Sequence, residues 1–212
     1  MLVSPSLLSA DFSKLESECR RMQAAGADWL HLDVIDGVFA PNITFGVPVV
    51  KALRPKTDLF FDLHLMIQNP LRYIEAFAEA GADCITFHIE SDSDARETIE
   101  KIHSFGIKAG VALKPGTPLE SVVKLIDLAD MILIMTVEPG FSGQKFMADM
   151  MPKLAALKQL CLGKEKWLQV DGGIGKDNIA LVAENGANVA VSGNSVFCAE
   201  NPKEVIDYFH SF

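Results

Sequence analysis

Short apolar runs typical of β-strands alternate with amphipathic segments typical of helices along the whole chain. Eight strands are predicted, in the runs VSPSLL, DWLHLDVI, LFFDLHLMI, CITFHIE, KAGVALK, MILIMTV, WLQVDGG and NVAVSG. Between them apolar residues recur at helical spacing, which predicts helices over residues 12–25, 71–80, 94–105, 119–128, 147–162 and 177–184. The motifs AAGAD, EAGAD and ENGAN each place a glycine at a helix end, where a left-handed C-cap is needed.

This alternation predicts parallel βαβ units, because a helix of this length suits the crossover between two parallel strands. Eight such strands without a linker or a composition break predict a single α/β domain over residues 1–212, a (β/α)8 TIM barrel. An open, doubly wound sheet is the alternative. No strand is followed by a GxGxxG or GxxxxGK[ST] motif that opens a helix, which favours the barrel.

Composition narrows the possible partners. The 212 residues are 49% hydrophobic and 22% charged, which suits one well-packed domain, and the net charge of -9 argues against a nucleic-acid surface. No segment approaches the roughly 20 apolar residues that span a bilayer, so we expect no membrane partner and a cytoplasmic protein. The four cysteines lie far apart without a CxxC pair, which favours reduced thiols over disulfides or a structural zinc site.

Polar residues gather at the ends of the predicted strands, which meet at the mouth of a barrel. His31 and Asp33 are two residues apart and therefore point to the same side of their strand, and Asp62 and His64 repeat this spacing on the next strand. Asp62 lies further from the mouth, and its role stays open. Imidazoles and carboxylates that converge in a low-dielectric site are costly unless a cation compensates them. We therefore predict a divalent metal on His31, Asp33, His64 and Asp171, with a metal-free hydrogen-bonded network as the alternative.

The mixed nitrogen and oxygen donors suit zinc, iron(II), manganese or cobalt better than calcium or magnesium. Glycine-rich loops after the last three strands, at residues 138–144, 170–175 and 191–197, favour phosphate binding through backbone N–H groups. A metal beside two carboxylates and a phosphate clamp suggests proton abstraction next to a carbonyl in a sugar phosphate, with the metal stabilising the enediolate. Inverting a carbon needs a base on one face and an acid on the other, a pair that Asp33 and Asp171 could supply.

At these positions the chain resembles the ribulose-phosphate 3-epimerase family. The similarity covers nearly the whole chain, through SPSLLSADF, HLDVIDGVFAPNITFG, DLHLM, TFHIE, ALKPGTP, MTVEPGFSGQKF, VDGGI and SGNSVF. The resemblance implies a (β/α)8 barrel that interconverts ribulose 5-phosphate and xylulose 5-phosphate by inversion at carbon 3, in the pentose phosphate pathway. It also implies one divalent ion on the four residues named above, with Asp33 as proton acceptor and Asp171 as proton donor in one direction.

The resemblance further implies a substrate site for a small-molecule sugar phosphate, and we expect a homo-oligomer. The implied substrate-binding residues are Ser6, His64, Gly140, Phe141, Ser142, Gly143, Gly172, Gly173, Gly193 and Asn194. Methionines that pack around the metal in this family are matched by Met66 and Met135. The chain departs from the family at Ile35, which replaces a methionine, at Val38, which replaces a histidine, and at Asn194 and Ser195, which replace small hydroxyl or alanine residues.

Three other functions fit parts of this pattern. A related hexulose-phosphate epimerase, such as allulose-6-phosphate 3-epimerase, would use the same metal and the same acid and base. Barrel decarboxylases or aldolases need an inward lysine, often as D-x-K, whereas the second strand here reads H-x-D. A non-catalytic sugar-phosphate binding barrel has no need of the metal-binding set.

Four further residues have open or structural interpretations. His88 is predicted to point to the mouth. Whether it supports the site or has a purely structural role is equally open. Lys114 could contact substrate or pair with a carboxylate. Trp29 and Trp167 begin strands and are predicted to pack between barrel and helices.

Overall fold

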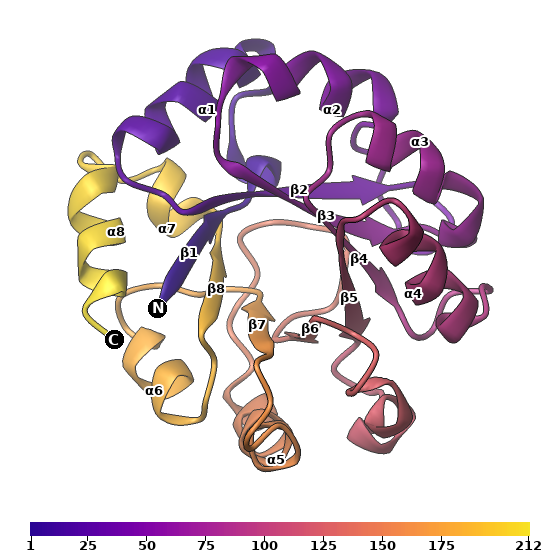
Figure 1. Cartoon of the computed structure of the whole chain (residues 1–212). Coiled ribbons are helices and arrows are strands. Elements are labelled where there is room, and N and C mark those ends of the chain that lie inside the picture. Colours follow the sequence, from indigo (N-terminus) through magenta and orange to yellow (C-terminus); the bar gives the residue numbers. More distant parts are fainter.

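The computed structural model describes all residues 1–212 and consists of eight parallel strands in a nearly closed barrel, with helices packed around it (Figure 1). The strands are β1 (Leu2–Pro5), β2 (Trp29–Ile35), β3 (Phe60–Met66), β4 (Cys84–His88), β5 (Lys108–Leu113), β6 (Met131–Met135), β7 (Trp167–Asp171) and β8 (Val189–Ser192). Seven of the predicted runs contain their strand, and the first, VSPSLL, begins one residue after the start of β1. The predicted (β/α)8 barrel in a single α/β unit is thus confirmed, and the open sheet is wrong.

The helices cover the outside of the barrel. They are α1 (Leu15–Ala24), α2 (Val47–Leu53), α3 (Ile74–Glu79), α4 (Ala95–Ser104), α5 (Met151–Leu160), α6 (Ile179–Glu184), α7 (Asn194–Phe197) and α8 (Pro202–His210). Short 3-10 helices are η1 (Leu7–Ser9), η2 (Phe12–Lys14), η3 (Arg54–Lys56), η4 (Pro70–Tyr73), η5 (Leu119–Ser121), η6 (Val123–Leu125) and η7 (Ala148–Met150). No helix combines the length and the apolar content that crossing a bilayer requires.

The barrel has a seam between β1 and β2. The hydrogen-bonded order of the strands runs β1-β8-β7-β6-β5-β4-β3-β2, so that these two strands are its ends. A single parallel bridge between Ser6 and His31 joins them. The seam is therefore closed at two of the residues singled out from the sequence.

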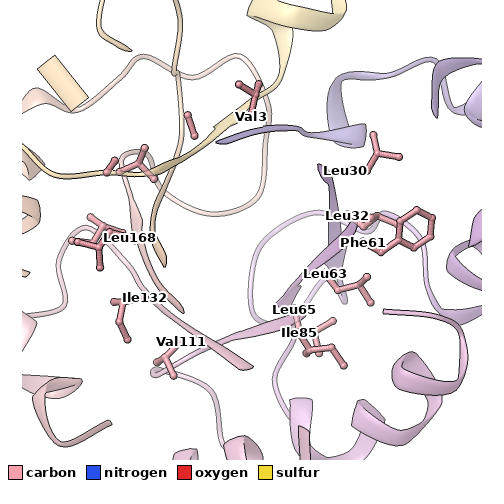
Figure 2. Close-up of a cluster of buried hydrophobic side chains, with 14 of the residues drawn as sticks. Val3, Leu30, Leu32, Phe61, Leu63, Leu65, Ile85, Val111, Ile132 and Leu168 are labelled. Atoms are coloured by element: carbon pink, nitrogen blue, oxygen red, sulfur yellow. The ribbon is translucent and has the colours of Figure 1, made fainter. Parts of the chain in front are cut away.

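Alternation along the strands separates the core from the site. Alternate strand residues face the helices, and most of them belong to one large apolar cluster, for example Leu32, Phe61 and Ile85 (Figure 2). The residues between them face the barrel interior, and in β2 and β3 these include His31, Asp33, Asp62 and His64. The strands thus bury an apolar face outward and carry polar groups inward.

The two tryptophans correct one sequence-based interpretation. Trp29 packs against Trp167 with ring centroids 4.7 Å apart and against Phe60 at 4.6 Å. Together with Cys84 and Met131 they form a separate apolar cluster. The prediction that they lie between barrel and helices is wrong: Trp29 precedes His31 by two residues, so it shares the inward face and fills the N-terminal end of the barrel.

The predicted helix over residues 119–128 is also wrong, because this segment forms only the 3-10 helices η5 and η6. The neighbouring β-branched Val122 and Val123 disfavour a continuous α-helix. Val122, Leu125 and Ile126 are nevertheless buried, so the apolar spacing is satisfied by turns. The other five predicted helices are present in shortened form, and α2, α7 and α8 are additional.

Candidate active site at the barrel mouth

Four side chains from β2, β3 and β7 converge at the C-terminal end of the barrel. His31, Asp33, His64 and Asp171 each offer one ligand atom, and these atoms lie within 4.8 Å of one another. His31 and His64 are fully buried, Asp33 is 2% exposed, and the Asp171 side chain is 17% exposed. The structure therefore brings together all four residues that were predicted to hold a metal.

The spacing of the four donor atoms suits one small divalent cation. His31 Nε2 lies 3.3 Å from His64 Nδ1, and these nitrogens lie 3.2 and 3.1 Å from Asp33 Oδ1. Asp171 Oδ2 lies 3.8 and 3.7 Å from the same two nitrogens. Metal–ligand bonds of roughly 2.0–2.1 Å in a tetrahedron separate neighbouring donors by about 3.3 Å. The residues present thus fit a cation of the zinc class.

A carboxylate supports the buried face of His31. His31 Nδ1 donates to Asp62 Oδ2 at 2.7 Å, and the same oxygen accepts from Gln169 Nε2 at 2.6 Å and from Ser4 Oγ at 3.3 Å. The carboxylate holds one proton of His31 on Nδ1, so Nε2 is the nitrogen directed at the other three donors. Asp62, whose role was open from the sequence, therefore orients His31.

Two further residues lie behind His64. Its Nε2 is 2.9 Å from Nε2 of His88, and Nδ1 of His88 is 3.0 Å from Glu90 Oε2. The other oxygen of Glu90 accepts from the backbone N–H of Lys114 at 2.8 Å. Burial lowers the pKa of His88 to about 4, which keeps its ring neutral. Burial alone would raise the pKa of Glu90, but the hydrogen bonds it accepts lower it to about 2.

Two hydroxyls fix the strand ends that carry the carboxylates. Thr44 Oγ1 donates to the Asp33 carbonyl at 2.6 Å, and Thr136 Oγ1 donates to the Asp171 carbonyl at 3.0 Å. Ser6 Oγ donates to Asp33 Oδ2 at 2.6 Å, which leaves Oδ1 facing the histidines. The candidate site is therefore held rigidly from strands on both sides of the mouth.

The two carboxyl groups have opposite pKa shifts. Burial alone would raise the pKa of Asp33, but the charges of His31 and His64 and their hydrogen bonds outweigh it and lower the pKa. Burial and the nearby negative charge of Asp33 raise the pKa of Asp171 to about 6. One carboxyl is therefore a stable anion, whereas the other readily carries a proton near neutrality, which is a division typical of acid and base partners.

A cavity of about 260 Å³ opens above these carboxylates. Asp33 and Asp171 line it, together with these residues of the predicted substrate site: Ser6, Gly140, Phe141, Ser142, Gly143, Gly172, Gly173, Gly193 and Asn194. His64 is fully buried and does not line the cavity, so its contact with the sugar stays a prediction. The loop over residues 138–144 is closed on itself by Gln144 Nε2, which donates to the carbonyls of Glu138 at 2.7 Å and Phe141 at 2.9 Å.

The residues that depart from the family pattern lie in different surroundings. Ile35 is buried against Met66 and Ala40, behind the wall of the cavity, which Met66 and Met135 line. Val38 is 70% exposed. The exposed Asn194 lies on the cavity wall beside Gly143, where an added Cβ would be 2.9 Å from the Asn194 amide nitrogen. Of the four residues that depart from the family pattern, Asn194 and Ser195 line the cavity, whereas Ile35 and Val38 do not.

Several residues that support the site were not assigned that role from the sequence. Asp62 was placed by its spacing, two residues before His64 and on the same face, but its role stayed open. Glu90 lies two residues after His88, but beyond the end of β4, where strand alternation no longer fixes direction. Thr44 and Thr136 act through backbone carbonyls, and such hydrogen bonds have no sequence pattern.

Comparison with known proteins finds similar sequences over nearly the whole chain. The model of the ribulose-phosphate 3 epimerase family matches residues 2–197. The chain is 48% identical to ribulose-phosphate 3-epimerase of Eremothecium gossypii, over 98% of this chain and 90% of that protein. It is 47% identical to the cytoplasmic isoform of Oryza sativa, over 96% and 90%. Among solved structures, 3-hexulose-6-phosphate synthase from Salmonella typhimurium superposes with a TM-score of 0.74 at 19% identity, covering 100% of this chain and 97% of that one.

Proposed function

Since the chain belongs to the ribulose-phosphate 3-epimerase family and is an epimerase, we propose that it interconverts D-ribulose 5-phosphate and D-xylulose 5-phosphate with one divalent cation and two acid-base carboxylates. The observation that carries the proposal is the set of four donor atoms at the floor of the cavity. Two of these donors, from Asp33 and Asp171, also line the cavity and can reach a substrate. A site with this composition can hold a cation and move a proton at the same place.

The residues proposed to hold the cation are His31, Asp33, His64 and Asp171. Zinc, iron(II), manganese and cobalt suit two imidazoles and two carboxylates better than calcium or magnesium do. When bound, the cation supplies Lewis-acid stabilisation of negative charge on the substrate oxygens. Asp62 and the residues behind His64 keep the imidazoles in place for it.

Inversion at carbon 3 follows from the two carboxyl groups. Asp33, whose pKa is lowered, removes the proton from one face of carbon 3, and Asp171, whose pKa is raised to about 6, delivers a proton to the other face. In the reverse direction the roles exchange. Ser6 holds Asp33 Oδ2 and lines the cavity, which places its hydroxyl beside the sugar.

The glycine-rich loops after β6, β7 and β8 are proposed to bind the phosphate. Gly172 and Gly173 have φ angles of 128° and 66°, and Gly193 lines the same cavity. Glycine lets the backbone approach an anion closely, so N–H groups replace a basic pocket. The other predicted phosphate contacts are Gly140, Phe141, Ser142, Gly143 and Asn194, all on this wall.

A hexulose phosphate such as allulose 6-phosphate is the alternative substrate, since the same carboxylates and cation would serve it. We further propose that the reaction belongs to the pentose phosphate pathway and that the protein is a cytoplasmic homo-oligomer. The rice relative, a cytoplasmic isoform, supports this compartment. A non-catalytic sugar-phosphate binding role gives no reason for two carboxyl groups with opposite pKa shifts.

Exchange of the carbon 3 proton tests the function directly. The purified protein, with its metal content measured, is incubated in deuterium oxide with ribulose 5-phosphate or with allulose 6-phosphate. We expect deuterium at carbon 3 and formation of xylulose 5-phosphate from the first substrate, with much slower reaction of the second. Absence of exchange with both substrates in the metal-loaded protein would exclude an epimerase of either kind.

Metal affinity should depend on pH because the cation competes with protons. Asp171 has its pKa raised to about 6, mainly by burial, so below pH 6 a proton must leave before the cation binds. Burial alone would lower the pKa of His31, but Asp33 and Asp62 raise it, so a second proton competes up to higher pH. As pH falls, the apparent dissociation constant for Zn²⁺ should therefore increase about tenfold per pH unit above pH 6, where one proton competes. Below pH 6, where two protons compete, it should increase about a hundredfold per pH unit. Asp171→Asn should remove only the extra dependence below pH 6, and equal slopes in both proteins would contradict this assignment.

Gly173→Ala should displace the loop over residues 138–146 and weaken phosphate binding. An added Cβ would lie 2.6 Å from the backbone nitrogen of Phe146 and 2.8 Å from the backbone oxygen of Gln144, which cannot move independently of the loop. We expect KM for the sugar phosphate to rise about tenfold or more. Gly163→Ala is the matched control, because Gly163 has a similar φ of 75° but no atom near the added Cβ. Equal KM values in the two variants would argue against the proposed contact.

A further inference from the structure

His88 and Glu90 form a hydrogen-bonded chain behind His64 that runs across three strands. It starts at His64 in β3, passes through His88 in β4 and ends on Glu90, whose second oxygen is held by the Lys114 N–H at the end of β5. His88 is fully buried between the ring of His64, 5.0 Å away, and the ring of Phe39, 4.7 Å away. No other partner of the His88 ring nitrogens is present.

The contacts of Glu90 determine which ring nitrogens of His88 and His64 carry protons. A backbone N–H can only donate, so Glu90 receives one hydrogen bond from Lys114 and, as a carboxylate, can also only accept from His88. A neutral His88 therefore carries its proton on Nδ1 and offers a lone pair on Nε2. His64 must then carry its proton on Nε2, because two lone pairs at 2.9 Å would repel each other.

The nitrogen of His64 left to face a cation is Nδ1, the atom 3.1 Å from Asp33 Oδ1 and 3.3 Å from His31 Nε2. We infer that His88 and Glu90 are positioning residues that keep a proton on Nε2 of His64, so that Nδ1 is the nitrogen that can bind a cation. The inference rests on the proposed function, since it concerns the same cation site. Asp62 holds the Nδ1 proton of His31 through a direct hydrogen bond, whereas Glu90 acts on His64 through the imidazole of His88.

Glu90→Gln should reverse the direction of the hydrogen bonds that His88 makes with residue 90 and with His64. The glutamine oxygen must stay on the Lys114 N–H, because that donor cannot change, so the amide NH2 faces Nδ1 of His88. His88 can respond by moving its proton to Nε2, which then donates to Nε2 of His64 and leaves the proton of His64 on Nδ1. The variant should therefore bind Zn²⁺ about 10- to 100-fold more weakly than the parent protein.

The experiment combines ring nitrogen-15 shifts in the metal-free protein with Zn²⁺ affinity measured against a chromophoric chelator. The chain has five histidines, so their ring nitrogens can be assigned. We expect Nε2 of His64 to carry a proton in the parent protein and to lack one in Glu90→Gln. Glu97→Gln, which changes an exposed carboxylate of α4, is the matched control and should alter neither readout.

Two variants of His88 separate hydrogen bonding from packing. His88→Phe keeps an aromatic ring between Phe39 and His64 but cannot accept a hydrogen bond, and it should weaken Zn²⁺ binding tenfold or more. His88→Gln can accept from His64 Nε2 through its side-chain oxygen and should bind within a few-fold of the parent. An Nε2 of His64 without a proton in the parent, or unchanged affinity in both Glu90→Gln and His88→Phe, would overturn the inference. Failure of the parent protein to bind Zn²⁺ would instead contradict the proposed cation site, because the tautomer is read without metal.

Discussion

The Asp171→Asn variant should lose epimerisation by about a factor of 10³ or more while the barrel stays folded. Asparagine keeps the shape and one oxygen of Asp171, but it can neither deliver nor accept the proton at carbon 3, and proton transfer by a positioned group is worth roughly 10²–10⁴ in rate. The Asp171 side chain is 17% exposed, and in the variant the buried His31 keeps its contacts with Asp33 and Asp62. Conversion of ribulose 5-phosphate to xylulose 5-phosphate, measured with the metal-loaded variant, gives the rate.

Isotope exchange makes this prediction specific to a two-base mechanism. Asp33 is intact in the variant, so the epimer whose carbon 3 hydrogen faces Asp33 should still exchange that hydrogen with solvent without inversion. Asp177→Asn, at an exposed position six residues further along, is the control and should epimerise at the parent rate. If Asp171→Asn retains a tenth or more of the parent rate, Asp171 is not the second acid-base group.

The barrel and its polar interior could be predicted because they depend on alternation. In β2 and β3 the period of two fixes which side chains face inward, and the residues on the opposite face are apolar without exception in β2. The same rule, applied to Trp29, would have placed it inside the barrel. The segment over residues 119–128 was mispredicted because apolar residues three or four apart satisfy 3-10 turns and an α-helix equally well over so short a length.

The supporting part of the site could not be predicted in the same way. His31 and Asp33 share one strand, so their relation is local, whereas the contact of His64 with His88 depends on the shift between β3 and β4, where His64 pairs with Thr86. Glu90 adds a turn beyond the strand, and its direction is set by the Lys114 N–H from β5. Such a chain depends on the register of three strands, which no single motif contains.

Removing the divalent cation should abolish activity and lower the melting temperature. Without it, Asp33 and Asp171 face each other across a buried site, and the pKa of Asp171 rises to about 6 because of burial and that repulsion. A cation present at about 100 times its dissociation constant contributes roughly 2.7 kcal/mol to the free energy of unfolding. For a chain of this size this corresponds to a melting temperature about 5–10 °C higher. Activity should fall by about 10³ or more, since charge developing on the substrate loses several kcal/mol of stabilisation.

Chelation followed by calorimetry and an activity assay measures both effects, with elemental analysis to establish that the protein is metal-free. Zn²⁺, Mn²⁺, Co²⁺ or Fe²⁺ should restore melting temperature and activity, whereas Ca²⁺ and Mg²⁺ should restore neither, because two of the four donors are imidazole nitrogens. His31→Ala is the internal control. It lacks one donor, so chelator should leave its melting temperature unchanged, which separates loss of the cation from any other action of the chelator. A metal-free parent protein with full activity would show that the four residues form a hydrogen-bonded network that works without a cation.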